Sequence, residues 1–263
     1  MNLTLKILGC GASGGVPAIG NYWGECDPSE PKNNRTRSSI AVMSDDSCVV
    51  VDTGPDFRQQ LNRENIQSID AVLYTHAHGD HVAGMDELRS FQRRYKRQVP
   101  VYGHVDTILE LQDRYAYMFK DLAGGLYPSV MDPYIFRDDE YCKPFDVAGI
   151  PFIPFKQDHH TCVSLGFRFG DIAYCTDMVD LEQQSIEAIK GVKTWIVDGA
   201  GKYSLTSPVH APIPKIIEMN KEIQAEEVYL THLSLIMDYQ TLRDELPKGY
   251  YPCYDGLEFT TSV

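Results

Sequence analysis

Hydrophobic and polar residues alternate in two distinct rhythms along this chain, and each rhythm predicts a type of element. Residues 1–8 alternate apolar with polar positions, as a β-strand does. Two short runs rich in β-branched residues, 39–43 and 48–51, flank the polar residues 44–47 and predict a hairpin. Further apolar runs predict strands at 71–74, 99–102, 134–136, 150–155, 164–169, 172–175, 194–197 and 227–230.

Longer amphipathic segments fill the intervals between these strands. They predict helices at 55–64, 85–94, 105–119, 181–190 and 213–224. Hairpins that alternate with strand–helix–strand units indicate a layered α/β fold, with two mixed sheets inside and helices outside. No internal repeat, low-complexity tract or long linker divides the 263 residues, so we expect a single domain over 1–263.

Composition and charge narrow the classes of protein. The chain has 24 basic and 37 acidic residues, and its net charge of −13 counts against a surface that coats nucleic acid or an anionic membrane. No apolar run approaches the roughly 18 residues that a membrane span needs. The seven cysteines are scattered and never form a Cys-x-x-Cys pair. Together with a start that lacks a secretion signal, this predicts a cytoplasmic protein with reduced thiols.

One segment carries most of the candidate chemistry. His76, His78, Asp80 and His81 directly follow a predicted buried strand. In an extended chain, His76 and His78 project from one face and can bind one ion, whereas the next two residues begin a new element and point towards a second ion. Imidazole and carboxylate ligands suit zinc, and also manganese or iron. A loop whose histidines only form hydrogen bonds is the alternative, and four such residues within six positions argue against it.

Three later strands lead into polar residues of the same kinds. The strand predicted at 150–155 leads to His159 and His160, the strand at 172–175 to Asp177, and the strand at 227–230 to His232. Strand ends on one rim of a pair of sheets converge in space. These residues can therefore complete two coordination shells.

Taken together, these features resemble the metallo-β-lactamase superfamily. The matching features are the strand-ending His-x-His-x-Asp-His, a later His, an Asp and a late Thr-His, each after a strand. The glycine-rich stretch 9–17 and the stretch 99–103 resemble the phosphodiesterase branch, and within it the phosphoribosyl cyclic phosphodiesterase of the carbon–phosphorus lyase pathway. The resemblance implies an αβ/βα sandwich of four layers, with two mixed β-sheets inside and helices outside.

The resemblance also implies two divalent metal ions, either zinc or manganese, with iron as a further option. The ligands that it implies are His76, His78 and His160 for the first ion, Asp80, His81 and His232 for the second, and Asp177 as a bridge between them. His160 is preferred to His159 because the sequence at 164–167 then matches the register of the family after its ligand.

The implied activity is that of a metal-dependent hydrolase, namely a phosphodiesterase that acts on a small cyclic phosphate or nucleotide through a metal-bridging hydroxide. Asp80 and Asp177 would orient that hydroxide for attack. His210 resembles an active-site histidine of the relatives and would act as a general acid or as a donor to the phosphate. A histidine of a surface loop is the alternative for His210.

Four further polar residues are candidates for supporting roles. Asp52 and Asp198 each end a β run, where they can orient a metal-bound imidazole or simply cap a turn. Arg35 and Arg37 lie near the glycine stretch 9–15 in sequence, and they either contact a phosphate or are solvated charges.

Other functions could use the same ligands. A nuclease that processes tRNA 3′ ends would need a basic arm that the sequence lacks, whereas a thioesterase or a non-catalytic metal-bound carrier would keep the same residues. The aromatic insert 113–133 is either a lid, part of the core or a contact in a homodimer. We expect a small phosphorylated or nucleotide-like substrate, with neither a membrane nor nucleic acid as partner.

Overall fold

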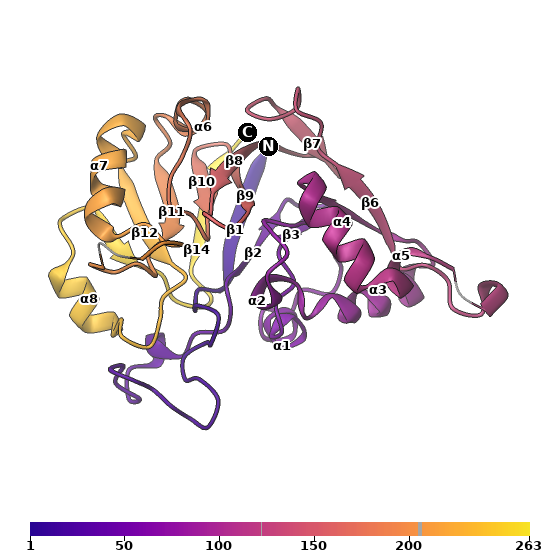
Figure 1. Cartoon of the computed structure of the whole chain (residues 1–263), viewed down its shortest axis with the longest axis horizontal. Helices are drawn as coiled ribbons and strands as arrows, with labels where there is room; N and C mark the ends of the chain where they lie inside the picture. The colour runs from indigo at the N-terminus through magenta and orange to yellow at the C-terminus, as the bar shows by residue number, and fades with distance from the viewer. Residues whose placement is uncertain (122, 205–206) are drawn as a thin grey trace.

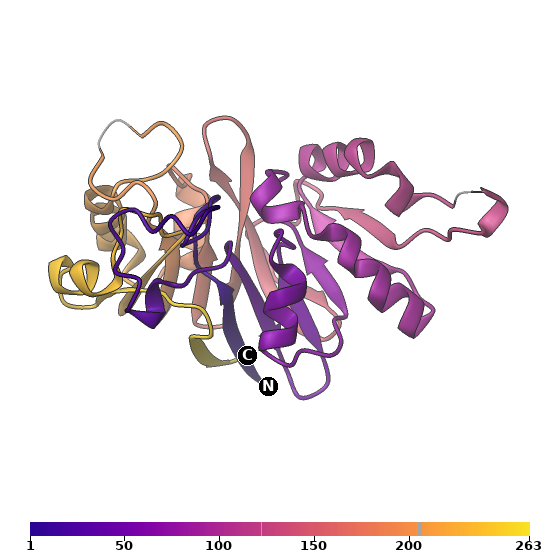
Figure 2. The same cartoon turned by 90° about the horizontal axis from the view of Figure 1, so that it is seen from below.

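Two seven-stranded sheets face each other in the part of the chain that the structure describes (Figure 1). The structure is a computed structural model, and it describes residues 1–121, 123–204 and 207–263. Helices cover the outer side of each sheet (Figures 1 and 2). The layered α/β arrangement with two mixed sheets inside is therefore confirmed.

The first sheet combines antiparallel and parallel strands. Its order is β14 (Glu258–Ser262), β1 (Asn2–Gly9), β2 (Ser39–Met43), β3 (Cys48–Val51), β4 (Ala71–Leu73), β5 (Val99–Gly103) and β6 (Met131–Ile135). The pairs from β14 to β3 are antiparallel, and those from β3 to β6 are parallel. The parallel strands therefore all end at one rim.

The second sheet repeats this plan. Its order is β13 (Tyr250–Pro252), β12 (Glu227–Thr231), β11 (Thr194–Asp198), β10 (Ile172–Cys175), β9 (Val163–Phe169), β8 (Ile150–Asp158) and β7 (Phe145–Val147). The pairs from β7 to β10 are antiparallel, and those from β10 to β13 are parallel. The carboxyl ends of β10, β11 and β12 therefore share a rim as well.

Helices follow the parallel strands, because a crossover between parallel neighbours needs a long connection. Those on the first sheet are α1 (Phe57–Arg63), α2 (Gly79–Val82), α3 (Leu88–Tyr95), α4 (Val105–Arg114) and α5 (Ala116–Phe119). Those on the second sheet are α6 (Gln183–Ile189), α7 (Ile213–Ile223) and α8 (Tyr239–Glu245). Short 3-10 turns lie at η1 (Pro31–Asn33), η2 (Met85–Glu87) and η3 (Ala123–Gly125).

Three apolar clusters separate the four layers. Val49 and Val51 of β3 pack between the sheets, whereas Val50 faces the helices outside the first sheet. In β10, Tyr174 faces the space between the sheets and Ala173 faces the helices outside the second sheet. Successive side chains of a strand point to opposite faces, so a strand buried on both sides has a continuous apolar run. This is why the sequence predicts these strands well.

Some element boundaries differ from the predicted ones. The helix predicted over 105–119 is broken at Tyr115, where the backbone leaves the helical region (φ −120°, ψ 38°). The break leaves Tyr115 and Tyr117 packed against the helix-side core. The strand predicted over 150–155 continues to Asp158, which pairs with Val163 of β9. β7, β13, β14 and α8 were not predicted.

The insert predicted at 113–133 runs through α5 and η3 and projects away from the sandwich (Figure 2). Its Tyr127 is 52% exposed, and Leu122 lies outside the described residues. Among the described helices, none combines the length and apolar character that crossing a membrane requires.

Candidate metal centre

Polar residues gather where the parallel strands of both sheets end. Asp52 follows β3, Asp177 lies two residues beyond β10, and His232 follows β12. All three have positive φ angles, 65°, 51° and 57°. This left-handed conformation is uncommon for residues other than glycine, although Asp and His adopt it more readily than most. It turns each chain sharply as it leaves the sheet, and strain of this kind is concentrated at functional sites.

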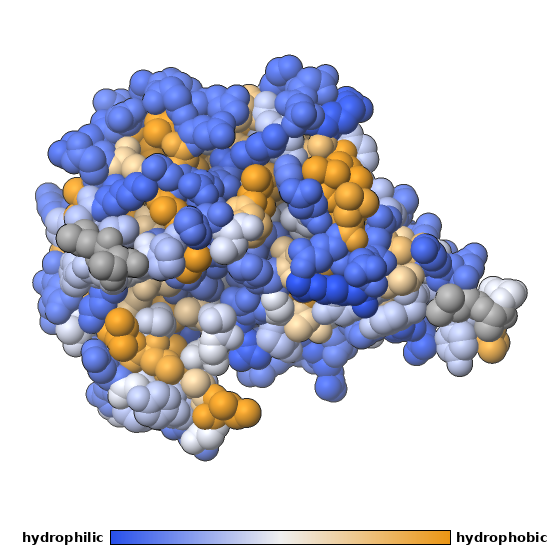
Figure 3. Space-filling view, viewed as in Figure 1, coloured by the Kyte–Doolittle hydropathy of each residue, from blue (hydrophilic) through white to orange (hydrophobic). Residues whose placement is uncertain are grey.

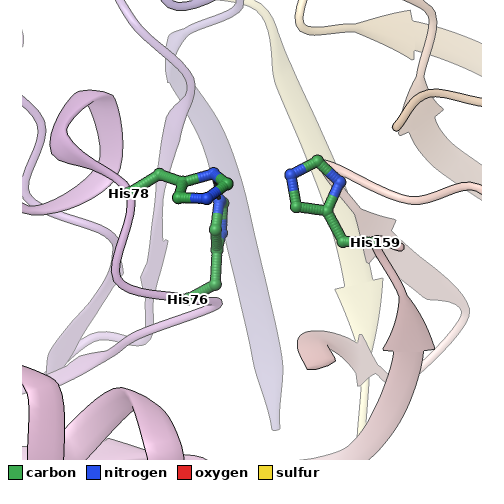
Figure 4. Close-up of side chains that lie close together, drawn as sticks. All are labelled: His76, His78 and His159. Atoms are coloured by element: carbon green, nitrogen blue, oxygen red, sulfur yellow. Dashed lines mark hydrogen bonds between the residues drawn. The ribbon is translucent and has the colours of Figure 1, made fainter. Parts of the chain in front are cut away.

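Three histidines form a first group of candidate ligands. His76 and His78 come from the loop between β4 and α2, and His159 comes from the opposite sheet and faces them (Figure 4). His76 Nε2 lies 2.9 Å from His78 Nδ1, and the His159 ring centroid lies 5.0 Å from that of His76 and 5.2 Å from that of His78. One nitrogen from each ring lies within 4.8 Å of the others, which is close enough to bind one ion.

The preference for His160 over His159 as a ligand is wrong, because the side chain of His159 faces the site and that of His160 does not. His159 is 2% exposed, whereas His160 is exposed at the turn after β8. The backbone of His160 has a positive φ of 62°, and its N–H donates to Asp158 Oδ1 over 2.7 Å. Because β8 continues to Asp158, His159 keeps the strand direction towards the site, and the turn directs His160 outwards.

A second group consists of Asp80, His81 and His232. Asp80 and His81 lie in the single turn of α2, whereas His232 comes from the other sheet. Asp80 Oδ2 lies 3.4 Å from His81 Nε2 and 3.4 Å from His232 Nε2. The position of α2 is fixed by backbone bonds, since Thr53 N–H donates to the His81 carbonyl.

Asp177 lies between the two groups. Its Oδ2 lies 3.0 Å from His81 Nε2 and 3.5 Å from His232 Nε2. Its Oδ1 lies 3.7 Å from His159 Nε2. The two carboxylate oxygens therefore face different groups, as a bridging ligand requires.

The outer ring nitrogens of three histidines have hydrogen-bond partners in the protein. His81 Nδ1 donates to Asp52 Oδ2 over 2.7 Å, and His159 Nδ1 donates to the Val209 carbonyl over 2.8 Å. His76 Nδ1 lies 3.0 Å from the Thr75 hydroxyl, whereas His232 Nδ1 is 3.8 Å from Asp198 Oδ1 and forms no hydrogen bond among the described residues. Partners of this kind fix the tautomer and direct the other nitrogen towards a metal.

Burial and charge set the protonation of these groups. Burial lowers the pKa of His76 and of His159, which favours the neutral imidazole that binds metal. Burial also opposes charge on His81, but the carboxylates of Asp177 and Asp52 outweigh it and raise the pKa of His81. Burial raises the pKa of Asp177, but the neighbouring histidines outweigh burial and hold this pKa well below its usual range. Asp177 is therefore ionised at neutral pH, as a carboxylate that binds a metal must be.

His210 lies beside this centre. Its ring centroid is 5.1 Å from that of His232 and 5.6 Å from that of His159. Its Nδ1 donates to Asp198 Oδ2 over 2.6 Å. Burial lowers the pKa of His210, but the hydrogen bond and charge of Asp198 more than offset this and raise it.

Asp52 and Asp198 are placed as supporting residues, and each also binds backbone. Asp52 accepts from Thr75 N–H over 2.8 Å, and Asp198 accepts from Met178 N–H over 3.1 Å. For Asp198, orienting a histidine and capping a turn are therefore compatible roles.

The two arginines have different surroundings. Arg35 is 1% exposed, and its guanidinium donates to the Met237 carbonyl and to Asn33 Oδ1 over 2.7 and 3.1 Å. It holds the N-terminal loop, residues 10–38 between β1 and β2, against the segment after His232. Neither of its two expected roles, a phosphate contact or a solvated charge, fits this buried position. Arg37 is partly exposed and pairs with Asp56 over 3.0 Å.

Sequence reasoning missed several groups that support the site. Thr75 binds both Asp52 and His76 through its hydroxyl, over 2.8 and 3.0 Å. The buried amide of Gln157 donates to Ser164, whose hydroxyl donates to the Asp177 carbonyl. The position of Thr75 directly before the first histidine is a signal that could have been used. The contribution of Val209 is a backbone carbonyl and leaves no trace in the sequence.

These residues fit divalent cations. The candidate ligands are imidazole nitrogens and carboxylate oxygens, they are mostly buried, and they converge in four overlapping groups. Within the described part of the chain, the inner nitrogen of His81 is buried and has no hydrogen-bond partner. A buried nitrogen without such a partner, surrounded by other candidate ligands, matches a site completed by metal.

Comparison with known proteins decides the family. The model of the β-lactamase superfamily domain matches residues 48–233, which include every candidate ligand. This chain belongs to the β-lactamase superfamily. The resemblance that the sequence predicts is thereby confirmed, and with it the metallo-β-lactamase type of fold.

Individual relatives extend over most of this metallo-β-lactamase-fold chain. A solved diphosphatase of the PhnP family is 30% identical, covers 99% of this chain and 98% of its own, and has a TM-score of 0.86. Human tRNase Z, short form, shares the fold with a TM-score of 0.65 at 17% identity, over 99% of this chain and 100% of its own.

A protein named octanoyltransferase from Porphyromonas gingivalis is 33% identical over 259 residues, or 96% of this chain. The chain spans half the length of that relative.

Proposed function

We propose that the chain is a dinuclear phosphodiesterase that acts on a small phosphate ester, such as a cyclic phosphate or a nucleotide. The observation that carries the proposal is the Asp177 carboxylate, whose oxygens face two separate ligand groups. The first ion would be held by His76, His78 and His159, and the second by Asp80, His81 and His232. Zinc and manganese both suit this set, as does iron. When bound, such a pair of ions polarises a phosphoryl oxygen and supplies a nucleophilic water at neutral pH.

The protein's own side chains would handle the protons. Asp80 and Asp177 would accept hydrogen bonds from the attacking water and so orient it. His210 would act as the general acid, because Asp198 holds its Nδ1 proton and leaves Nε2 to protonate the departing oxygen. The raised pKa of His210 supports this role, since a larger fraction of the imidazole carries a proton near neutral pH.

A leaving-group comparison tests these roles. With Mn²⁺- or Zn²⁺-loaded protein, we expect turnover of bis(p-nitrophenyl) phosphate and of 2′,3′-cyclic nucleotides, and loss of both in His76→Ala. His210→Gln should slow the cyclic nucleotides roughly a hundredfold, because their alkoxide needs a proton, and should affect release of p-nitrophenolate only slightly. Equal losses on both substrates would contradict the role of His210. Wild-type turnover no faster than that of His76→Ala would contradict the phosphodiesterase.

A second candidate activity is hydrolysis of a diphosphate linkage. The diphosphatase of the PhnP family, 30% identical over 99% of this chain, favours it. In that reaction the leaving group is a phosphate. The same ions and the same His210 would keep the roles proposed for hydrolysis of a phosphodiester. A panel that includes diphosphate esters, cyclic phosphates and an octanoyl thioester, compared by kcat/KM, separates these candidates.

A further inference from the structure

A groove between α1 and α3, on the outer side of the first sheet, has no role in the proposed function (Figures 1 and 2). One part of it is a slot with a volume of about 240 Å³. A more open part of about 640 Å³ adjoins the slot along α1. The surface over the lower centre of the molecule, where Figure 1 places α1 and α3, is largely hydrophilic (Figure 3).

The floor of the slot is apolar. Phe57 and Leu61 of α1 and Phe91 of α3 contribute to it, and all three are buried in the core outside the first sheet. Ile66 also lines the slot and is partly buried against the same core. A slot of this volume admits one large apolar side chain, whereas pockets for small-molecule ligands usually have roughly 300–1,000 Å³.

Cations surround this apolar floor. Arg58 on α1 and Arg94 on α3 line the slot and are exposed. Arg93 and Lys96, which are near Arg94 in sequence, are exposed as well. Within the described part of the chain, none of these four side chains forms an ion pair. Glu87 is the acidic residue that lines the slot, so positive charge predominates at its rim.

The stability of the fold does not account for this cluster of cations. The chain has 37 acidic and 24 basic residues, and neighbouring arginines do have acidic partners. Arg89 pairs with Asp86 over 3.2 Å, and Arg97 pairs with Asp70 over 2.7 Å. Unpaired charges of one sign repel each other, which disfavours the compact state. The unpaired cations are therefore available to a partner of opposite charge.

We propose that this groove docks an acidic segment of a partner protein, and that the segment inserts one large apolar side chain into the slot. A guanidinium can bind both oxygens of one carboxylate, so Arg58 and Arg94 would recognise the acidic residues. The guanidinium carbon of Arg94 lies 5.3 Å from the centroid of the Tyr95 ring. This stacking leaves the edge of the guanidinium free to donate hydrogen bonds. An amphipathic segment in an apolar groove is a recurring mode of peptide recognition.

The same observations favour a protein over a nucleic acid as the occupant. A nucleic acid presents an extended array of phosphates, which would also meet the acidic surface of a chain with a net charge of −13. A short peptide segment contacts the groove alone, and its apolar side chain matches the floor formed by Phe57, Leu61 and Phe91. None of the residues that line the slot belongs to the candidate metal centre, so the proposal is independent of the proposed function.

A matched pair of synthetic peptides tests the proposal. Both are short, glutamate-rich and labelled with fluorescein, and they differ in one central residue, which is phenylalanine in one peptide and alanine in the other. Fluorescence anisotropy should show that the wild-type protein binds the phenylalanine peptide at least roughly tenfold more tightly, because its aromatic ring fills the slot. Higher salt should weaken the binding of both peptides, because it screens the arginines.

Three variants separate charge from shape. Arg94→Glu should weaken binding of the phenylalanine peptide at least roughly tenfold, because a repelling charge replaces an attracting one. Arg243→Glu makes the same charge change at an exposed position on α8 and should keep the affinity within about twofold of the wild type. Ser90→Trp leaves the charge unchanged but fills the slot, so it should abolish the preference for the phenylalanine peptide.

Equal affinity of the wild-type protein for the two peptides would overturn the proposal, and this comparison stays decisive even if a variant fails to fold. Equal binding by Arg94→Glu and Arg243→Glu would overturn it as well. A single-stranded RNA that displaces the labelled peptide at a lower concentration than the unlabelled phenylalanine peptide does would assign the groove to nucleic acid instead. A wild-type dimer that Arg94→Glu dissociates, seen by sedimentation, would assign it to a second copy of this chain.

Discussion

His159 and His160 are neighbours in sequence but lie in opposite surroundings. His159 is buried between the ring of His76 and the Val209 carbonyl, which accepts from its Nδ1. His160 is exposed, and only its backbone takes part in the local turn through Asp158. The two side chains therefore form a natural test of which groups belong to the proposed metal site.

We predict that His159→Ala and His160→Ala have very different effects. Loss of a residue that only supports a ligand weakens metal binding roughly tenfold to a hundredfold. Removing His159 should weaken it by at least as much, because His159 is itself a proposed ligand. His160→Ala should leave metal content and activity within about twofold of the wild type. Elemental analysis after dialysis and kcat/KM on one phosphodiester measure both effects. Equal losses in the two variants would contradict the assignment.

The sequence identified most of the candidate site but not the choice between these two residues. His76, His78, Asp80 and His81 were recognisable because four potential ligands within six residues rarely serve packing. Which of two adjacent histidines faces the site depends on where β8 ends and on the turn that follows it. Both are tertiary properties, and a shift of one residue reverses the face on which a side chain lies.

Asp52 offers a second prediction at this scale. Its carboxylate is fully buried and binds His81 Nδ1, the Thr75 N–H and the Thr75 hydroxyl. Asp52→Asn should lower metal affinity roughly tenfold to a hundredfold, because the amide no longer fixes the tautomer of His81. Asp45→Asn, at the exposed turn of the β2–β3 hairpin, is the control. Competition with a metal-binding dye measures affinity, and an unchanged value for Asp52→Asn would refute the prediction.

At the scale of single elements, the start of helix α8 holds the N-terminal loop in place. Asp238 precedes α8, and its Oδ1 accepts from Thr241 N–H over 2.9 Å, as a helix cap does. Its Oδ2 accepts from the Asn33 side chain over 2.6 Å and from Asp27 N–H over 3.1 Å. One carboxylate therefore caps a helix and holds the loop that carries Arg37.

Asp238→Ala should lower the free energy of unfolding by about 1–2 kcal/mol at pH 7, the usual cost of losing a cap. Burial raises the pKa of Asp238, but hydrogen bonds from Thr241, Asn33 and Asp27 lower it from 3.8 to about 2. The ionised form is thus the one that stabilises the fold. Its contribution should be complete above pH 4 and should disappear as the pH falls through about 2.

Denaturant midpoints of the wild type and Asp238→Ala between pH 7 and pH 3 measure this effect. The gap between the two proteins should narrow as the pH falls below 4. Asp244→Ala, an exposed acidic position on the same helix, serves as control and should show little change. A gap that stays constant over this range would argue against the assigned direction.

The elements that the sequence predicts best are the ones buried on both faces. β3 and β10 are continuous apolar runs because each separates two apolar clusters. The last part of the chain was missed for the opposite reason. β13 has three residues, one of them proline, and α8 is largely polar, so neither has the periodicity that marks an element. Their positions depend on neighbours that are remote in sequence.

At the scale of the whole molecule, the candidate ligands are divided between the two sheets. His76, His78 and the residues of α2 follow β4 of the first sheet, whereas His159, Asp177 and His232 follow strands of the second. A metal ion bound by both sets would therefore join the two halves of the sandwich. A metal ion that binds only the folded state also stabilises that state by mass action.

We predict that removing metal with a chelator lowers the thermal midpoint by about 5–10 °C, and that adding Mn²⁺ or Zn²⁺ restores it. The size follows from roughly 2.7 kcal/mol of stabilisation when free metal exceeds its dissociation constant a hundredfold. His159→Ala should show a smaller shift, because one side of a shared site is lost. Scanning calorimetry measures each midpoint, and a wild-type midpoint that ignores both treatments would rule out this linkage.

The division of ligands between sheets also has a consequence for the order of events in refolding. Neither of the two proposed metal sites is complete in one half, since each combines residues that precede position 82 with residues that follow position 158. Tight uptake of an ion must then wait until the second sheet has docked on the first. In a stopped-flow experiment, the signal of a metal indicator would report the final assembly of the sandwich rather than the earlier formation of its strands.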